Sequence, residues 1–193
     1  MTSTAEMIGV VGGGQLARML VQAAAERHVP IAVQTPSGQD PASEGATRQV
    51  SADPRDVAGT RDLVQGCCGV TFENEWVDIA ALRPLERQGV CFSPGLKALS
   101  PLVDKLSQRQ LLDELAIPAP PWCALTEISP SQPALPKGWH FPVMAKASRG
   151  GYDGKGTLAL HSIEELAQLL RRVEADDWLL ESWVDFEREL ALV

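Results

Sequence analysis

The first half of the chain alternates short apolar runs with glycine-rich turns and helix-like segments. Four apolar runs predict strands, at residues 7–11, 31–35, 69–72 and 90–92. An alanine-rich stretch that runs to about Arg27 and the segment 76–88 predict helices between them. Asp53, followed by proline, predicts the N-cap of another helix that reaches about Gln65. This order of elements predicts an α/β fold with a small doubly wound parallel sheet.

The second half of the chain carries strands that are closer together in sequence. Residues 104–115 predict a helix, and residues 142–157 predict an apolar strand that runs into a glycine-rich hairpin. A capping box at residues 162–165 predicts the start of the next helix. The segments 177–181 and 188–193 predict two further strands. Because the last strand pattern reaches the final residue, we expect it to continue in sequence that this chain does not include.

The glycine-rich turn after the first predicted strand is a candidate ligand site. Gly12, Gly14 and Ala17 match G-x-G-x-x-A, a pattern that places a phosphate or another polar group over a helix N-terminus. A site for the ribose of a nicotinamide cofactor needs an acidic residue at the end of the second strand, where this chain has Gln34 and Thr35. The sequence therefore argues against NAD.

Polar residues also follow the third predicted strand. Glu73 and Asn74 come directly after residues 69–72, and open α/β sheets bind ligands at the carboxyl ends of their strands. Both residues are therefore candidate substrate contacts. The alternative is a helix start at which Asn74 or Asp78 is the cap.

The hairpin within residues 142–157 is the strongest candidate for a phosphate-binding element. Its glycines are Gly150, Gly151, Gly154 and Gly156. They allow positive φ and close approach of backbone N–H groups to a ligand, while Lys146 and Lys155 supply positive charge. A P-loop is excluded, since it needs glycine at Arg149 and a hydroxyl residue at Gly156. The alternative is an ordinary turn with solvated lysines, but Lys146 lies in an apolar strand and is expected to meet a fixed anion.

Composition narrows the class of protein. The chain has 193 residues, of which 45% are apolar, so it has enough apolar side chains for a substantial core. Seventeen basic and 25 acidic residues give a net charge of −8 without a basic stripe, which argues against nucleic-acid binding. We find neither a membrane-length apolar run nor a signal-peptide pattern, and expect a cytosolic protein. The four cysteines and three histidines lack metal-ligand spacing, and the cysteines are expected to be reduced and mostly buried.

Five motifs occur in an order typical of one family: Gly12-Gly-Gly-Gln-Leu-Ala-Arg-Met19, Thr71-Phe-Glu-Asn74, Asp104-Lys-Leu-Ser-Gln-Arg-Gln-Leu111, Gly150-Gly-Tyr-Asp-Gly-Lys-Gly156, and Glu181 with Glu187-Arg-Glu-Leu190. On these motifs the chain resembles the 5-(carboxyamino)imidazole ribonucleotide synthases, the ATP-grasp enzymes of purine biosynthesis. The Tyr-Asp pair in the glycine loop is the most specific of these features. The resemblance covers only about the first half of a family member.

The resemblance implies a pre-ATP-grasp domain over residues 1–100 and an incomplete α+β ATP-grasp domain over residues 101–193. It implies a ligase that uses ATP to activate bicarbonate as carboxyphosphate and then carboxylates the amine of 5-aminoimidazole ribonucleotide, giving ADP and phosphate. Magnesium is the implied cofactor beside ATP, with its ligands and the bicarbonate contacts beyond residue 193. The family also implies a homodimer, and the chain alone is expected to be an incomplete enzyme.

The family's binding residues are implied at matching positions. Those for ATP are Lys105, Lys146, Gly151, Tyr152, Asp153, Gly154, Lys155, Gly156, Thr157, Glu181, Ser182, Trp183, Val184 and Glu189. Those for the substrate are Gln15, Leu16, Glu73, Tyr152, Asp153 and Lys155. Lys105 and Lys146 are implied phosphate contacts, residues 181–184 an adenine contact, and Glu189 a ribose contact. Asp153 and Lys155 are the implied catalytic residues: the first orients the aminoimidazole or takes its proton, and the second holds carboxylate or phosphate.

Three alternatives remain open. Another ATP-grasp carboxylate-amine ligase is expected to share Lys146 and the glycine loop, but not the pair Tyr152-Asp153. A noncatalytic nucleotide-binding module agrees with the strand pattern that ends at Val193. An NAD-type oxidoreductase rests on the first glycine turn alone, and a comparison of ATP binding with NAD binding distinguishes it.

Overall fold

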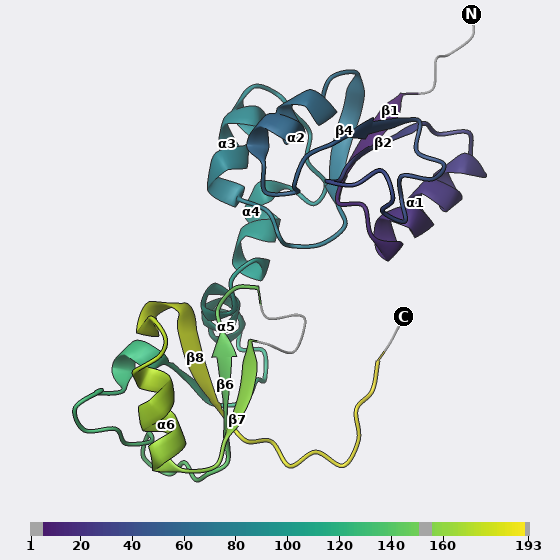
Figure 1. The fold of residues 1–193 in the computed structure, drawn as a ribbon. Helices are drawn as coiled ribbons and strands as arrows, with labels where there is room; N and C mark the ends of the chain where they lie inside the picture. Colours follow the sequence, from purple (N-terminus) through teal and green to yellow (C-terminus); the bar gives the residue numbers. More distant parts are fainter. Residues whose placement is uncertain (1–5, 151–155, 192–193) are drawn as a thin grey trace, which may run out of the picture. The chain divides into compact units, whose positions relative to one another are not determined.

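The computed structural model describes residues 6–150 and 156–191, and the chain divides into two compact units between Val103 and Asp104 (Figure 1). Gly151, Tyr152, Asp153, Gly154 and Lys155, which the sequence analysis selected, lie outside the described residues. None of the helices within the described ranges is long and apolar enough to cross a membrane.

The first unit contains a four-stranded parallel sheet with the strand order β3-β2-β1-β4. Its strands are β1 (Met7–Val11), β2 (Ile31–Gln34), β3 (Arg48–Val50) and β4 (Cys67–Phe72). Its α-helices are α1 (Gln15–Ala25), α2 (Val57–Leu63), α3 (Ile79–Arg87) and α4 (Leu96–Leu99). The parallel α/β arrangement predicted from the sequence is confirmed.

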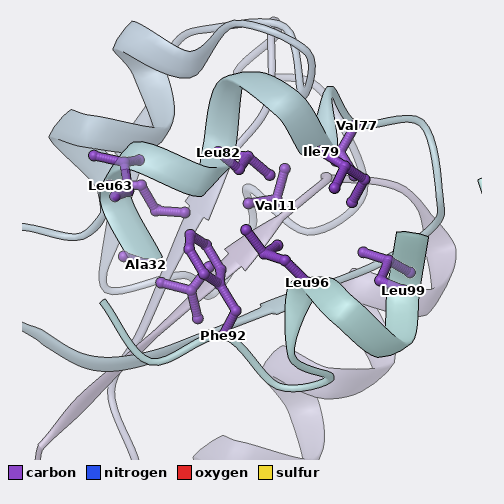
Figure 2. Packing of buried hydrophobic residues seen from close by; sticks show 11 residues of the cluster. Val11, Ala32, Leu63, Val77, Ile79, Leu82, Phe92, Leu96 and Leu99 are labelled. Carbon is purple, nitrogen blue, oxygen red and sulfur yellow. The ribbon is translucent and has the colours of Figure 1, made fainter. Parts of the chain in front are cut away.

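Two adjacent valines of β1 belong to two separate hydrophobic clusters. Val10 packs with Ala17 and Val21 of α1, whereas Val11 belongs to the cluster formed by α2, α3 and α4. Figure 2 shows Val11 among side chains of that second cluster, including Leu82 of α3. Because successive side chains of a strand point to opposite faces, this alternation covers both faces of the sheet with helices.

The edges of this sheet differ from the prediction. Strand β3 was not predicted, because its sequence Arg-Gln-Val lacks an apolar run and it pairs only with β2. The predicted strand at residues 90–92 is reduced to one parallel bridge between Val70 and Phe92. The sheet keeps four strands, although one of them is not a strand that the sequence predicted.

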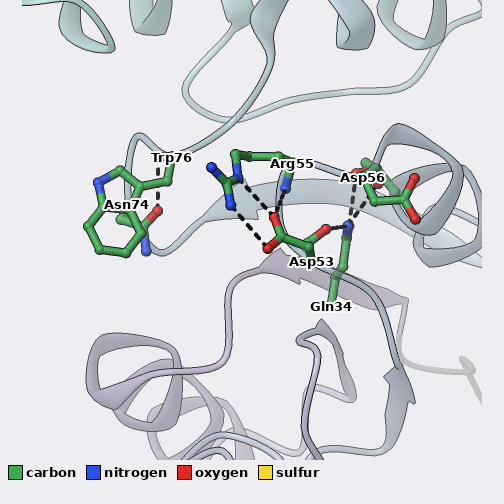
Figure 3. Close-up of polar contacts among 7 residues, drawn as sticks. Gln34, Asp53, Arg55, Asp56, Asn74 and Trp76 are labelled. Carbon is green, nitrogen blue, oxygen red and sulfur yellow. Dashed lines mark hydrogen bonds and ion pairs between the residues drawn. The ribbon is translucent and has the colours of Figure 1, made fainter. Parts of the chain in front are cut away.

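The predicted start of α2 is also wrong. The N-cap is Asp56, whose carboxylate accepts a hydrogen bond from Ala58 N at 2.9 Å, and not Asp53. Asp53 Oδ1 accepts from Arg55 N at 2.9 Å and also pairs with the Arg55 side chain, as Figure 3 shows. Asp53 therefore forms a local turn with Arg55, and the helix is capped by the next aspartate, Asp56.

The second unit contains an antiparallel sheet with the order β5-β8-β6-β7. Its strands are β5 (Trp122–Ala124), β6 (Val143–Ala147), β7 (Thr157–Leu160) and β8 (Trp178–Ser182). Its α-helices are α5 (Lys105–Glu114) and α6 (Ile163–Leu170). Leu166 and Leu169 of α6 pack on Val143, Ala145 and Leu180, which gives this face of the sheet a hydrophobic core.

The last predicted strand is not formed in the part of it that the structure describes. Residues 188–191 have no strand pairing, and Leu190 is 87% exposed. A strand needs a hydrogen-bonded neighbour as well as apolar side chains, and no neighbour lies beside these four residues in the sheet described above.

The cysteines are less buried than predicted. All four thiols are free, but Cys68 and Cys91 are exposed, and Cys67 is intermediate. Cys123 is buried on β5, and burial together with the nearby Glu127 carboxylate raises its pKa to about 11, against a smaller lowering by a backbone hydrogen bond. Thiolate reactivity therefore differs sharply between these positions.

We expect iodoacetamide at pH 8 to modify Cys68 and Cys91, while Cys123 stays unmodified in the folded protein. The Cys123 thiol is buried, and pH 8 lies well below its pKa of about 11, so that little of it is thiolate. Peptide mass spectrometry over a time course measures each site. The same reaction in urea is the control, where all cysteines should be modified. Rapid modification of Cys123 in the native protein would contradict the packing of β5.

Candidate functional site

Lys146 and Glu181 meet across two neighbouring strands of the second unit. In the antiparallel register of β6 and β8, Met144 lies opposite Glu181 and Lys146 opposite Leu179. Lys146 and Glu181 are therefore diagonal neighbours on one face of the sheet, away from the core residue Ala145. Lys146 Nζ lies 2.5 Å from Glu181 Oε2. The anion that the sequence predicted for Lys146 is, in this structure, the Glu181 carboxylate.

The other oxygen of this carboxylate is bound by helix α5. Arg109 Nε donates to Glu181 Oε1 at 2.6 Å, and its terminal nitrogen Nη2 lies 2.5 Å from the same oxygen. The side chains of Glu181, Arg109 and Lys146 are 4%, 17% and 25% exposed. One buried carboxylate is thus shared by two cations, and the three side chains together carry one excess positive charge.

The N-terminus of α5 is joined to the end of β6. Lys105 N donates to Ser148 O at 2.8 Å, and Lys105 Nζ donates to Ala147 O at 3.2 Å. The N-cap residue Asp104 accepts from Ser107 N through Oδ1 and pairs with Arg149 Nε at 3.0 Å through Oδ2. Through these contacts the cation Lys105 lies beside the strand that carries Lys146.

Asp104 has a perturbed acidity. Burial raises the pKa of its carboxyl, but the hydrogen bonds from Ser107 N and from Arg149, with the charge of Arg149, outweigh burial, so that the pKa lies below its ordinary value of 3.8. The ionised Asp104 therefore caps the N-terminus of α5 and also pairs with Arg149, the residue just before the glycine loop.

The glycine-rich hairpin joins β6 to β7 as the sequence predicted. Lys146 pairs with Thr157, and Ala147 N donates to Gly156 O at 2.7 Å. Gly150, where the loop begins, has φ +72°, a left-handed conformation that glycine adopts without strain. The loop that carries the Tyr-Asp pair therefore starts within a few residues of Lys146.

The predicted adenine and ribose contacts lie on the segment that leaves β8. Ser182 N donates to Pro121 O at 2.8 Å, which fixes the end of the strand. Trp183 and Val184 are 45% and 46% exposed, and Glu189 is exposed as well. The structure thus brings Lys146 and Glu181 into contact and places Lys105 beside the end of β6, whereas Trp183, Val184 and Glu189 are exposed.

In the first unit, Glu73 lies at the N-terminus of α1. Its carboxylate accepts hydrogen bonds from Gly14 N at 2.7 Å and from Ala17 N at 3.4 Å. A Cβ on Gly14 would lie 2.5 Å from Glu73 Oε1, so this approach requires glycine. The glycine turn that the sequence predicted as a phosphate site is occupied here by the chain's own carboxylate. Gln15 and Leu16, in the first turn of α1, are exposed.

The residues after Glu73 take the structural roles that the sequence left open. Asp78 caps α3, since its Oδ1 accepts from Ala81 N at 3.0 Å. Asn74 Oδ1 accepts from Trp76 N at 3.0 Å and closes a short turn (Figure 3).

Gln34 takes the position at which a nicotinamide site would need an acidic residue. Its amide nitrogen donates to Asp53 O at 2.7 Å and to Asp56 O at 3.0 Å (Figure 3). Its oxygen accepts from Thr60 Oγ1 at 2.8 Å. The side chain is fully buried. It therefore holds the loop before α2 against β2, and no acidic side chain takes that position.

Comparison with known proteins identifies the two units. The ribonucleotide synthetase preATP-grasp domain family matches residues 5–101, and the ATP-grasp domain family matches residues 110–193. The chain belongs to the ribonucleotide synthetase preATP-grasp family. Its second unit contains an ATP-grasp domain.

Individual members of the family are similar over nearly the whole chain. The N5-carboxyaminoimidazole ribonucleotide synthase of Synechococcus elongatus is 44% identical over 191 residues, which is 99% of this chain and 48% of that protein. The carboxyaminoimidazole ribonucleotide synthase of Aspergillus clavatus, solved with ATP, is 27% identical with a TM-score of 0.84. That comparison covers 95% of this chain and 48% of the other. A structure from the same fungus contains ADP and 5-aminoimidazole ribonucleotide, with 26% identity, a TM-score of 0.77 and the same coverage. The chain thus spans about half the length of the relatives that it matches.

Sequence reasoning missed Arg109 and underrated Arg149. Lys105 and Arg109 are four residues apart on the predicted helix, which places them on the same helix face. That spacing was the available signal. The carboxylate partner of Arg109 lies 72 residues farther along the chain, and only the tertiary fold brings the two into contact.

We expect Asp104→Ala to lower the free energy of unfolding by about 1 kcal/mol at pH 7, because it removes the cap of α5 and the partner of Arg149. The folded-state pKa is below 3.8, so the contribution of the charge is present above pH 3.8 and is lost as the pH falls through the lower native value. Urea unfolding of wild type and variant from pH 7 to pH 2 measures this difference. Asp185→Ala, at an exposed position, is the control. A difference that does not shrink in acid would contradict the role of the charge.

We expect Glu73→Ala to destabilise the first unit by about 1 kcal/mol, since Gly14 N and Ala17 N lose their acceptor at the α1 N-terminus. Glu73→Gln retains an acceptor oxygen and should lose less. Thermal unfolding of both variants beside Glu75→Ala measures the effect. Equal losses in Glu73→Ala and Glu75→Ala would show that the contact contributes nothing particular.

Proposed function

We propose that this chain provides the ATP-binding part and a portion of the substrate-binding part of an N5-carboxyaminoimidazole ribonucleotide synthase. The reaction carboxylates the amine of 5-aminoimidazole ribonucleotide with bicarbonate, and ATP is converted to ADP and phosphate. The observation that carries the proposal is the 44% identity over 191 residues to the Synechococcus elongatus enzyme of that name. The proposal agrees with the position of the cation cluster, which we define as Lys105, Arg109, Lys146 and Arg149. Lys146 lies on the strand from which the glycine-rich hairpin of the ATP-grasp domain begins.

The charge balance of the cluster supports a role in binding phosphates. Arg109 and Lys146 pair with Glu181, and Arg149 pairs with Asp104. Lys105 adds a fourth cation at the end of β6, where its Nζ donates to Ala147 O. Phosphoryl transfer depends mainly on positioning and on charge placed around the transferred group. In the proposed reaction, Lys105 and Lys146 bind nucleotide phosphates, Gly151 to Thr157 covers them, residues 181–184 bind adenine, and Glu189 binds ribose.

The substrate contacts of the proposal follow from the family resemblance. Gln15, Leu16 and Glu73 contact the aminoimidazole ribonucleotide, together with Tyr152. Asp153 orients the aminoimidazole or takes its proton, and Lys155 holds carboxylate or phosphate. The proposal also includes bicarbonate as the carbon source, a homodimer and a cytosolic location, each of which follows from the family resemblance.

Magnesium is part of the proposed reaction, but the described residues offer it no site. Among residues 6–150 and 156–191, no group of three His, Cys, Asp or Glu side chains is close enough to hold a metal ion. The side chains near Lys146 are predominantly cationic, which suits phosphate oxygens and does not suit a divalent cation. We therefore derive no step through the metal.

A hybrid enzyme tests the proposal. This chain is fused to the part of the Synechococcus elongatus relative that it does not cover, and phosphate release from ATP is measured with magnesium and bicarbonate, with and without 5-aminoimidazole ribonucleotide. We expect release that depends on the ribonucleotide. Release that is the same without it would overturn the substrate assignment.

Lys146→Met in this hybrid should raise the KM for ATP about 10- to 100-fold, the range expected for the loss of a charge-assisted contact to phosphate. The fold should survive, because Arg109 still pairs with Glu181. Lys137→Met, at an exposed lysine of the same unit, is the matched control. An unchanged KM in Lys146→Met would remove this lysine from the nucleotide site.

A further inference from the structure

We infer that Arg109 is a positioning residue, which holds the Glu181 carboxylate so that Lys146 stays available to an incoming phosphate. The inference rests on the proposed nucleotide site and adds to it a residue that contacts no ligand itself. It also gives Glu181 a side-chain role distinct from the adenine contact proposed for its segment.

The geometry separates the two partners of Glu181. Arg109 binds Oε1 through two nitrogens, at 2.6 and 2.5 Å, whereas Lys146 binds only Oε2, at 2.5 Å. Each cation therefore has its own oxygen. When Lys146 turns toward a phosphate, Glu181 keeps both contacts from Arg109 and is not left alone in its buried position.

Removal of Arg109 changes this balance. Glu181 is 4% exposed, so water does not replace a lost partner, and a buried carboxylate without a counter-ion is strongly unfavourable. Lys146 would then be its only cation among the contacts that the structure gives this carboxylate. A phosphate that takes Lys146 would have to break that pair, and its affinity would fall.

A purely structural role for Arg109 is the competing explanation. None of the residues of α5 is fully buried, so the helix is held to the sheet largely through polar contacts such as Arg109 with Glu181. If tethering were the whole role, loss of Arg109 would weaken nucleotide binding in the same way whether or not Glu181 carries a charge. The two explanations therefore differ in how the effect depends on Glu181.

Binding of ADP to the 193-residue chain distinguishes them. Isothermal titration calorimetry is carried out on wild type, Arg109→Met, Glu181→Gln and the double variant. We expect Arg109→Met to raise the Kd about tenfold or more, the loss expected when a charge-assisted pair must be broken. In the Glu181→Gln background the same change should raise it less than about threefold, because no carboxylate then competes for Lys146.

Three further variants keep the test decisive. Arg109→Lys retains the charge beside Glu181 and should stay within about threefold of wild type in its Kd for ADP. Arg109→Gln replaces Arg109→Met if the latter does not fold, as judged by circular dichroism. Arg171→Met, at an exposed arginine of the same unit, controls for the loss of one positive charge.

The outcomes separate this inference from the proposed function. An equal rise in Kd in both backgrounds, or none in either, would overturn the positioning role while the substrate assignment of the hybrid enzyme stands. Wild type that binds no ADP would overturn it too. Loss of ribonucleotide-dependent phosphate release in the hybrid, with the dependence on Glu181 intact, would instead overturn the proposed substrate and leave Arg109 as assigned.

Discussion

The second unit depends on one buried carboxylate that two cations share. Glu181 on β8 needs charged partners because it is only 4% exposed, and α5 needs a tether because it has no fully buried side chain. The pair formed by Arg109 and Glu181 meets both needs. Lys146 on β6 is then held on the same face of the sheet, beside the start of the glycine hairpin. The cation cluster is therefore a consequence of how the helix is attached.

The central strands were predictable because they are continuous apolar runs. Val10 and Val11 pack into different clusters on the two faces of the sheet, and a strand that is buried on both faces is a run of apolar residues, which the sequence displays directly. Strand β3 was missed because Arg48, Gln49 and Val50 are only partly buried and owe their conformation to pairing with β2. The described part of the last predicted strand, residues 188–191, was wrong for the opposite reason. Its apolar pattern is typical of a strand, but no neighbouring strand in the described sheet pairs with it. Apolar spacing reports which side chains prefer burial, and it does not report which backbone groups find a partner.

The same limit applies to the candidate site. Lys146 could be selected because a cation within an apolar strand requires an anion, which is a local argument. Its partner could not be identified, because Glu181 is 35 residues away and Arg109 lies on a helix before both. The family resemblance implied Glu181 as part of the adenine segment, residues 181–184, and the structure adds its side-chain contacts with Lys146 and Arg109. A buried ion pair requires both partners to be positioned, and only the antiparallel register of β6 and β8 does this.

Both units place one of their own carboxylates where an anion would be expected to bind. Glu73 accepts hydrogen bonds from the N-terminus of α1, and Glu181 lies between Lys146 and Arg109. A helix N-terminus and a pair of cations attract any small anion, so an internal carboxylate at each position disfavours phosphate or sulfate that has no further contacts. A nucleotide differs because its base and ribose add contacts beyond the phosphates. Such competition lowers the affinity for single small anions and favours ligands that make contacts at several points at once.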